Sequence, residues 1–131
     1  MHMSRRAIAG PILALAIVSA HVPTSAQTPA KVQQFVYVLR VAPALHDSSK
    51  WTEKENNAVG RHFARLEEAT KSGKVIFAGK TSEPLASTFG LVVFEANDEA
   101  SAKQFMESDP AVVAGVMTAP LHPYVLALQR K

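Results

Sequence analysis

His62 is the residue of this sequence whose type and position are best suited to chemistry. It lies in RHFARLEEATKSGKVIFAG, residues 61–79, which is typical of the second half of an amphipathic helix, a glycine stop and a short apolar strand. Val59 and Leu66 flank it on the helix surface, so we expect a partly buried imidazole at the border of the apolar stripe. A neutral imidazole is suited to general base catalysis near pH 7. The alternative is a boundary histidine that is hydrogen-bonded to a backbone carbonyl.

Asp109 is the second candidate, and it stands directly before Pro110. An aspartate in that place is the expected cap of a helix start, because its carboxylate accepts backbone amides and proline fits the first turn. We therefore expect a capping role for Asp109, which is compatible with a further role in chemistry.

The sequence lacks the motifs of metal, nucleotide and nucleic-acid binding. The histidines beyond residue 26 share no metal-ligand spacing, and neither HxxxH nor HExxH occurs, so we predict no metal. The P-loop, the Rossmann glycines and G-x-S-x-G are absent, and we expect no cofactor. Basic residues are scattered without an aromatic–basic array, so we expect no nucleic-acid partner.

The first 26 residues have the three regions of a secretory signal peptide. Arg5 and Arg6 precede an uncharged apolar run at residues 7–20, and residues 21–26 are short and rich in small side chains. We predict cleavage after Ala26 and a periplasmic or secreted protein, exported by either the general or the twin-arginine route. The alternative is an uncleaved anchor, but the run is short for a span of about 20 residues. We therefore expect no stable membrane insertion after cleavage.

Removal of the signal would leave a polar tail, residues 27–34, and one small domain, residues 35–131. The formal net charge of the whole chain is +3, and Arg5 and Arg6 of the predicted signal peptide contribute part of it. This net charge therefore does not indicate nucleic-acid or membrane binding. The chain has no cysteine, which excludes disulfides and a thiol nucleophile. Small domains that lack disulfides often gain stability by forming oligomers.

A strand and a long helix open the domain. Residues 35–41 are β-branched or aromatic on both faces, which predicts a strand covered on both sides. Thr52 and Glu55 form a capping box, and Gly73 is placed to end a helix of about 20 residues. Gly60 inside it costs on the order of 1 kcal/mol and indicates a close approach to the backbone or a bend. The apolar stripe of this helix is Val59, Phe63 and Leu66.

The second half of the domain repeats the alternation of strands and helices. The predicted elements are a strand at 74–79, a loop at 80–87, a strand at 88–95, a helix from a cap at Asn97 or Asp98 to 108, a helical turn at 111–116 and an edge strand at 121–129.

The order β-α-β-β-α-β predicts an α+β fold. The simplest packing is ferredoxin-like, a four-stranded antiparallel sheet with two helices on one face. The central strands are apolar on the other face too, and a large exposed apolar face marks a partner surface. We infer a homodimer in which the two sheets meet face to face.

Two sequence blocks resemble the YCII-related (YciI-like) family. They are HFARL at 62–66 with Gly73 and AG at 78–79, and DP at 109–110 with AGV at 114–116. The resemblance covers about residues 35–128 and implies a dimeric α+β barrel built from ferredoxin-like subunits. It also implies a pocket in which His62 and Asp109 are candidate catalytic groups. Relatives include a dehydrochlorinase-type enzyme, and muconolactone isomerases share the fold. Lys80 departs from the family, whose members often have proline there.

If His62 and Asp109 meet, the carboxylate could orient and polarise the imidazole. Such a pair could move a proton next to a carbonyl, as isomerisation or elimination of HX requires. Four other residues are candidate substrate-binding groups: Arg40, His46, Trp51 and His122.

The four candidates differ in their alternatives. For Arg40, a salt bridge at the rim is the favoured interpretation, and binding of an anionic substrate is the other. His46 and Trp51 lie in or beside the first loop, where ligand contacts concentrate, although such a histidine is usually solvated. His122 is expected near the dimer edge.

Two functions stay open. One is a small exported lyase or isomerase that acts on a small, aromatic or lactone-like substrate with His62 as base and Asp109 as its partner. The other is a non-catalytic dimeric module that binds a small hydrophobic molecule.

Overall fold

The computed structural model describes residues 10, 22, 26, 28, 29 and 31–131. The predicted signal peptide, residues 1–26, and its cleavage site lie almost entirely outside these residues. The elements in chain order are β1 (Gln33–Val41), η1 (Pro43–Leu45), η2 (Ser48–Lys50), α1 (Glu53–Lys71), β2 (Val75–Lys80), β3 (Gly90–Ala96), α2 (Glu99–Glu107), α3 (Pro110–Val113), β4 (Met117–Thr118) and β5 (Leu121–Tyr124). Within the described part of the chain, no helix is both long and apolar enough to cross a membrane.

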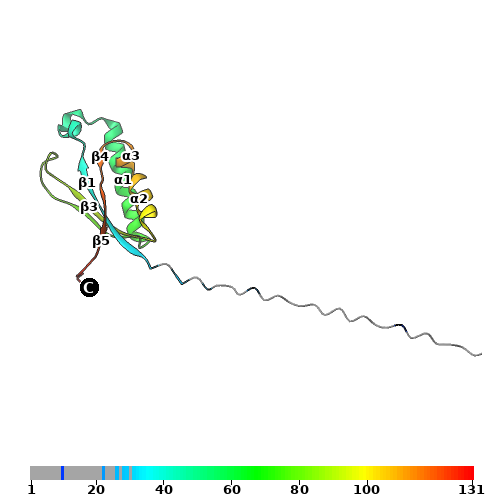
Figure 1. Cartoon of the computed structure of the whole chain (residues 1–131). Helices are drawn as coiled ribbons and strands as arrows, with labels where there is room; N and C mark the ends of the chain where they lie inside the picture. The colour runs from blue at the N-terminus through cyan, green and yellow to red at the C-terminus, as the bar shows by residue number, and fades with distance from the viewer. Residues whose placement is uncertain (1–9, 11–21, 23–25, 27, 30) are drawn as a thin grey trace, which may run out of the picture.

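The strands form one antiparallel sheet in the order β2-β3-β1-β4, and β5 also pairs with β1. Thr118 of β4 pairs with Arg40, and Leu121 of β5 pairs with Tyr37, so β4 and β5 continue one another along the same edge of β1. Figure 1 shows α1, α2 and α3 gathered on one side of the strands. The ferredoxin-like prediction is therefore confirmed, with a fourth strand that is interrupted at residues 119–120.

The predicted strand at 121–129 is wrong in its second half, because β5 ends at Tyr124. Tyr124 pairs with Gln34, and β1 begins only one residue before Gln34, so no strand is left to pair with the residues that follow. The amide of Leu126 donates to the Gln34 side chain instead, at 2.8 Å. Residues 125–131 have no regular secondary structure, and the side chain of Leu128 is 92% exposed.

The third strand begins at Gly90 rather than at the predicted residue 88. The Thr88 hydroxyl donates to the Thr81 carbonyl at 2.8 Å, and the Thr81 amide donates to the Phe89 carbonyl at 2.9 Å. These bonds close the loop between β2 and β3 before the two strands begin to pair.

The loop between β1 and α1 contains the two short turns η1 and η2.

Helix α1 begins and ends where local signals predict. Thr52 is its N-cap, and the backbone amide of Thr52 donates to the Glu55 carboxylate at 2.8 Å, which completes the capping box. Gly73 has a φ of 83°, a left-handed conformation that glycine adopts without steric cost. A Cβ at Gly60 would meet nothing within 4 Å, so no close approach accounts for that glycine.

The core lies between the sheet and the helices, and aromatic rings fill its centre. Phe94 packs against Tyr37 with ring centroids 5.7 Å apart, edge to face, and against Phe105 at 4.8 Å. Phe35, Tyr37 and Phe94 are each at most 2% exposed. Each such ring contributes roughly 1.5–3 kcal/mol by burial. These contacts hold the Tyr37 side chain rigidly beneath α1 and α2.

The sheet face opposite the helices is also apolar. Val36 and Val93 pair across β1 and β3 on that face and are 8% and 1% exposed. On β2 the register shifts between Val75 and Phe77, because Val75 pairs with Phe94 whereas Phe77 pairs with Val93. Phe77 therefore lies on the opposite face from Val75 and is 41% exposed.

Candidate functional site

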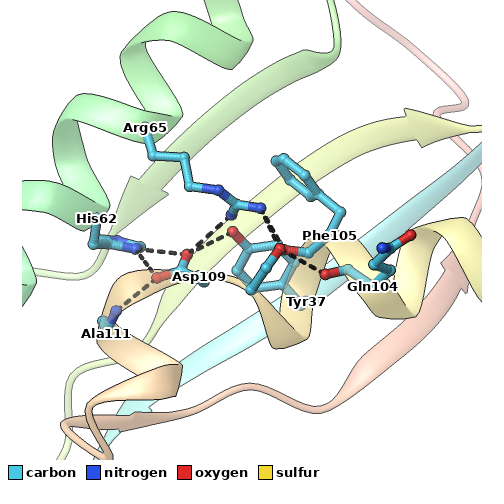
Figure 2. Close-up of polar contacts among 8 residues, drawn as sticks. Tyr37, His62, Arg65, Gln104, Phe105, Asp109 and Ala111 are labelled. Carbon is cyan, nitrogen blue, oxygen red and sulfur yellow. Dashed lines mark hydrogen bonds and ion pairs between the residues drawn. The ribbon is translucent and has the colours of Figure 1, made fainter.

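The structure brings His62 and Asp109 into direct contact. His62 lies on α1 and its side chain is 11% exposed, while Asp109 precedes α3 and is fully buried. Nδ1 of His62 lies 2.8 Å from Oδ1 and 2.7 Å from Oδ2 of Asp109. Figure 2 shows the imidazole directed at the carboxylate. A carboxylate only accepts hydrogen bonds, so Nδ1 carries the hydrogen of this contact.

The local backbone fixes the position of Asp109. It is the N-cap of α3, and its Oδ1 accepts the Ala111 amide at 2.9 Å, with Pro110 in the first turn. The cap predicted from the sequence is present, and the same carboxylate bonds His62. Both roles are compatible because a carboxylate has two oxygens with several lone pairs.

Tyr37 is a third member of the cluster, and the sequence patterns do not indicate it. From β1, its hydroxyl donates to Oδ2 of Asp109 at 2.9 Å, and this contact is drawn beside the carboxylate in Figure 2. Burial, together with the neighbouring negative charge of Asp109, raises the pKa of Tyr37 far above its usual range. Tyr37 therefore remains a hydrogen-bond donor at all physiological pH values. No sequence signal connects it with Asp109, because the two residues meet only through the packing of the sheet.

Arg65 is a fourth member, one turn beyond His62 on α1. Its Nη2 donates to the Phe105 carbonyl and to the Ser108 hydroxyl, both at 2.8 Å, and the guanidinium lies 4.1 Å above the Phe105 ring. Its Nη1 is 3.9 Å from Oδ2 of Asp109, and this buried nitrogen has no hydrogen-bond partner among the described residues. The helical spacing of three residues from His62 is a signal that could have indicated Arg65.

The environment keeps the carboxyl group of Asp109 ionised. Burial alone would raise the pKa of Asp109, but hydrogen bonds from His62, Ala111 and Tyr37 stabilise the charged form and hold this pKa below its usual range. An ionised Asp109 holds the hydrogen on Nδ1, which leaves Nε2 as the ring nitrogen that can accept a proton. The arrangement can therefore offer Nε2 as a base and stabilise the imidazolium that forms.

His62 also borders a large, mainly apolar cavity of about 750 Å³ between α1 and the sheet. Leu39, Val59, Phe63, Leu66, Ala78 and Val92 are among the apolar residues of its wall. Asp109 is not part of that wall, so only the imidazole of the pair can touch a ligand. The prediction that Phe63 packs in the apolar stripe of α1 is wrong, because its side chain is 69% exposed and borders this cavity instead.

The structure divides the other predicted site residues between three places. Trp51 lines the large cavity, and its indole nitrogen donates to the Leu45 carbonyl at 2.8 Å. Arg40 and His46 line a smaller neighbouring cavity of about 180 Å³. His122 is exposed on β5, pairs with Val36, and lines neither cavity.

Arg40 corrects one expectation. The favoured salt bridge is not formed, because Arg40 has no acidic partner within the described residues. Its guanidinium lies 5.2 Å from the centre of the Phe89 ring instead. The same part of the chain has no group of three or more His, Cys, Asp or Glu side chains that could hold a metal ion.

The fold and the site together define a ferredoxin-like α+β protein with a histidine–aspartate pair beside an apolar cavity. The chain belongs to the YCII-related family, since residues 34–120 match the family model described as the YCII-related domain. The resemblance drawn from the two sequence blocks is thereby confirmed. No curated protein matches the chain.

A solved structure has a similar fold. It is the 5-chloro-2-hydroxyhydroquinone dehydrochlorinase (TftG) from Burkholderia phenoliruptrix AC1100, in complex with 2,5-dihydroxybenzoquinone. The TM-score is 0.53 at 18% sequence identity, and the match covers 70% of this chain and 93% of that one. At this identity the likeness shows a shared fold.

Proposed function

We propose that this protein is a small enzyme of lyase or isomerase type, in which His62 is the general base and Asp109 is its positioning residue. The observation that carries the proposal is the contact between Nδ1 of His62 and the buried carboxylate, at 2.7 Å, beside a cavity large enough for a small molecule. An imidazole at the wall of an apolar cavity, held from behind by a buried carboxylate, is an arrangement typical of active sites.

The proposed step is a proton transfer at carbon. Nε2 of His62 takes a proton from a carbon next to a carbonyl, the electron pair of the broken C–H bond forms a C=C bond to the carbonyl carbon, and the π pair of the carbonyl moves onto its oxygen as an enolate. In an elimination, the enolate re-forms its carbonyl, the C=C pair moves to the next carbon, and a halide leaves that carbon with the electron pair of its own bond. In an isomerisation, the proton returns to another carbon of the same conjugated system. Asp109 stabilises the imidazolium throughout, as in other histidine–carboxylate pairs.

The apolar wall supports a small aromatic or lactone-like substrate. The cavity walls carry side chains such as Leu39, Phe63 and Val92, which favour a flat, apolar body. The structural neighbour is named a dehydrochlorinase of a chlorinated hydroxyhydroquinone, which supports the same class of substrate for this chain.

Proton exchange at carbon tests the proposal with a small set of candidate compounds. The protein is incubated in D₂O with chlorinated hydroxyhydroquinones, butenolides and cyclic diketones. ¹H NMR measures the loss of C–H signals, and a chloride-selective electrode measures the release of halide. We expect exchange or elimination with at least one compound, and a fall of about 100-fold or more in His62→Gln. Arg61→Gln is the matched control, because Arg61 is exposed on α1 and lines neither cavity.

A non-catalytic binding module is the second candidate, and the predominantly apolar wall of the large cavity favours it. In that case a compound would bind, yet the protein and His62→Gln would exchange its protons at the same rate. Equal rates for every compound that binds would therefore reject the catalytic proposal and leave the binding function.

We further propose that two copies of this chain associate through the sheet face opposite the helices. Support comes from the apolar residues Val38 and Leu91, which pair across β1 and β3 and are only half-buried, and from the exposed Phe77 on the same face. Sedimentation velocity is expected to give a dimer, and Leu91→Lys should shift it to a monomer. A monomeric protein at micromolar concentration would count against this association.

We also propose that the protein is exported. The support is the arginine-led apolar segment at residues 1–26 with small residues before Gln27. N-terminal sequencing of the protein from a cell envelope or periplasmic fraction should begin at Gln27. A cytoplasmic protein that retains residues 1–26 would contradict it.

A further inference from the structure

A small second cavity opens at the end of β1, and its lining differs from that of the large one. Its volume is about 180 Å³, and Arg40, His46, Thr88 and Thr118 supply polar groups to its wall. Arg40 and Thr118 are cross-strand partners on β1 and β4, so their side chains are neighbours. None of the described residues that line this cavity is acidic.

The positive charge at this place is not neutralised. Arg40 contacts the Phe89 ring but makes no ion pair within the described residues. Lys80 adds a second cation at the same end of the sheet, because it pairs with Gly90, which in turn pairs with Leu39. Glu67, the acidic residue in the wall of the large cavity, is already paired with Lys71 at 3.1 Å.

The two cavities adjoin. Val41, Leu85 and Thr88 line both of them, so the small polar cavity continues the large apolar one. The ring of His46 is held in the wall of the small cavity by a bond from Nε2 to the Val41 carbonyl at 3.0 Å. Arg40 alternates with Leu39 along β1 and so projects from the sheet face opposite α1, but the Phe89 ring that it contacts also lines the large cavity. A molecule seated in the large cavity can therefore extend a polar group into the small one around the end of β1.

We propose that the small cavity binds the anionic group of the substrate, so that the substrate class is an aromatic or lactone-like carboxylate. Arg40 holds the carboxylate, since a guanidinium offers two parallel donors that match its two oxygens. The Thr118 hydroxyl supplies a further donor. This inference rests on the proposed function for its apolar part and adds the charge that the ligand must carry.

Isothermal titration calorimetry with two probes of the same shape tests the inference without any turnover. The probes are 2-naphthoate and its neutral isostere 2-naphthamide, titrated at low salt into the protein. We expect naphthoate to bind about five- to tenfold more tightly, as one partly exposed charge-assisted pair provides. Arg40→Gln should remove this preference while leaving the affinity for naphthamide unchanged, and Thr118→Val should reduce the preference.

Arg61→Gln is the matched control, because it removes an exposed arginine of α1 that lines neither cavity. It should retain the full preference for naphthoate. Equal affinities of the two probes for the unaltered protein, or an equal loss of both in Arg40→Gln, would overturn the anion site and leave the proposed function standing. Binding of neither probe at millimolar concentration would overturn both the anion site and the proposed aromatic substrate.

Discussion

Oδ2 of Asp109 accepts Nδ1 of His62 at 2.7 Å and the Tyr37 hydroxyl at 2.9 Å, although these donors lie 47 and 72 positions away in the chain. One carboxylate oxygen thus joins α1 to β1 at a point that water does not reach. We therefore expect replacement of this oxygen to affect both the stability of the fold and the position of the His62 imidazole.

Asp109→Asn is expected to lower the free energy of unfolding by about 2–4 kcal/mol, since it removes a buried charge from groups that are arranged to donate to it. Urea unfolding followed by circular dichroism measures the change. Asp98→Asn, at the exposed N-cap of α2, changes the same chemical group outside the cluster and should cost clearly less.

The stability that Asp109 provides should depend on pH with a defined sign. Its pKa is lower in the folded than in the unfolded protein, so its contribution is complete above the unfolded pKa of about 3.9 and is lost as the pH falls through the folded pKa. The difference in unfolding free energy between the protein and Asp109→Asn should therefore shrink between pH 5 and pH 2. A difference that stays constant over this range would contradict the depressed pKa of Asp109.

Tyr37→Phe removes one donor from the carboxylate but keeps the ring between Phe94 and Phe105. We expect a loss of about 1–2 kcal/mol in unfolding free energy. Tyr124→Phe serves as the control, because Tyr124 is half-buried on β5 and makes no side-chain hydrogen bond within the described residues, so its change should stay within about 0.5 kcal/mol. Equal effects of the two changes would remove Tyr37 from the cluster as an energetic partner.

Two glycines should respond to alanine with opposite signs. Gly60 lies inside α1 with open space around a Cβ, so Gly60→Ala should raise the unfolding free energy by about 0.5–1 kcal/mol. Gly73 has a φ of 83°, and Gly73→Ala should lower it by about 1–2 kcal/mol. Thermal melts of the two variants, shifted in opposite directions, are the expected outcome. A destabilised Gly60→Ala would indicate a contact to α1 outside this chain.

Phe63 should matter for the ligand more than for the fold. Because it is 69% exposed, Phe63→Ala should change the unfolding free energy by no more than about 0.5 kcal/mol. The substitution should nevertheless lower the affinities for 2-naphthoate and 2-naphthamide by the same factor, about two- to tenfold, because one aromatic contact is lost. Val113→Ala, which shortens an equally exposed apolar side chain of α3, should leave both affinities unchanged. Unaltered binding in Phe63→Ala would move the ligand away from this wall.

The parts of the fold that could be predicted from the sequence are those set by nearby residues. The start of α1 at Thr52, its end before Gly73 and the cap at Asp109 each depend on contacts within a few positions. The strand predicted at 121–129 stops at Tyr124 because a strand needs a partner, and the length of β1 decides how much partner there is.

The candidate site, too, could be predicted only where nearby residues determine it. The helix position of His62, the capping position of Asp109 and the family resemblance indicate these two residues, and the structure brings them together. These signals do not indicate Tyr37, because its part in the cluster arises from the packing of β1 beneath the carboxylate. The helical spacing places Arg65 near His62, but its contacts with Phe105 and Ser108 depend on the packing of α2. The ion pair expected for Arg40 does not form, and its guanidinium contacts the Phe89 ring instead. A local sequence pattern could not predict this, because the partner of a charged side chain depends on which distant residues fold beside it.

The register shift on β2 has a consequence for the empty space beside His62. In an uninterrupted ladder that starts from the pair Val75–Phe94, Phe77 would stand opposite Val92. The extra backbone residue gives that place to Ala78, so a methyl group occupies the wall where a benzyl ring would otherwise project. One additional peptide unit in an edge strand thus places Ala78 instead of Phe77 on the α1 side of β2, although Phe77 still borders the cavity, and a change that restores regular pairing there should reduce the room beside His62.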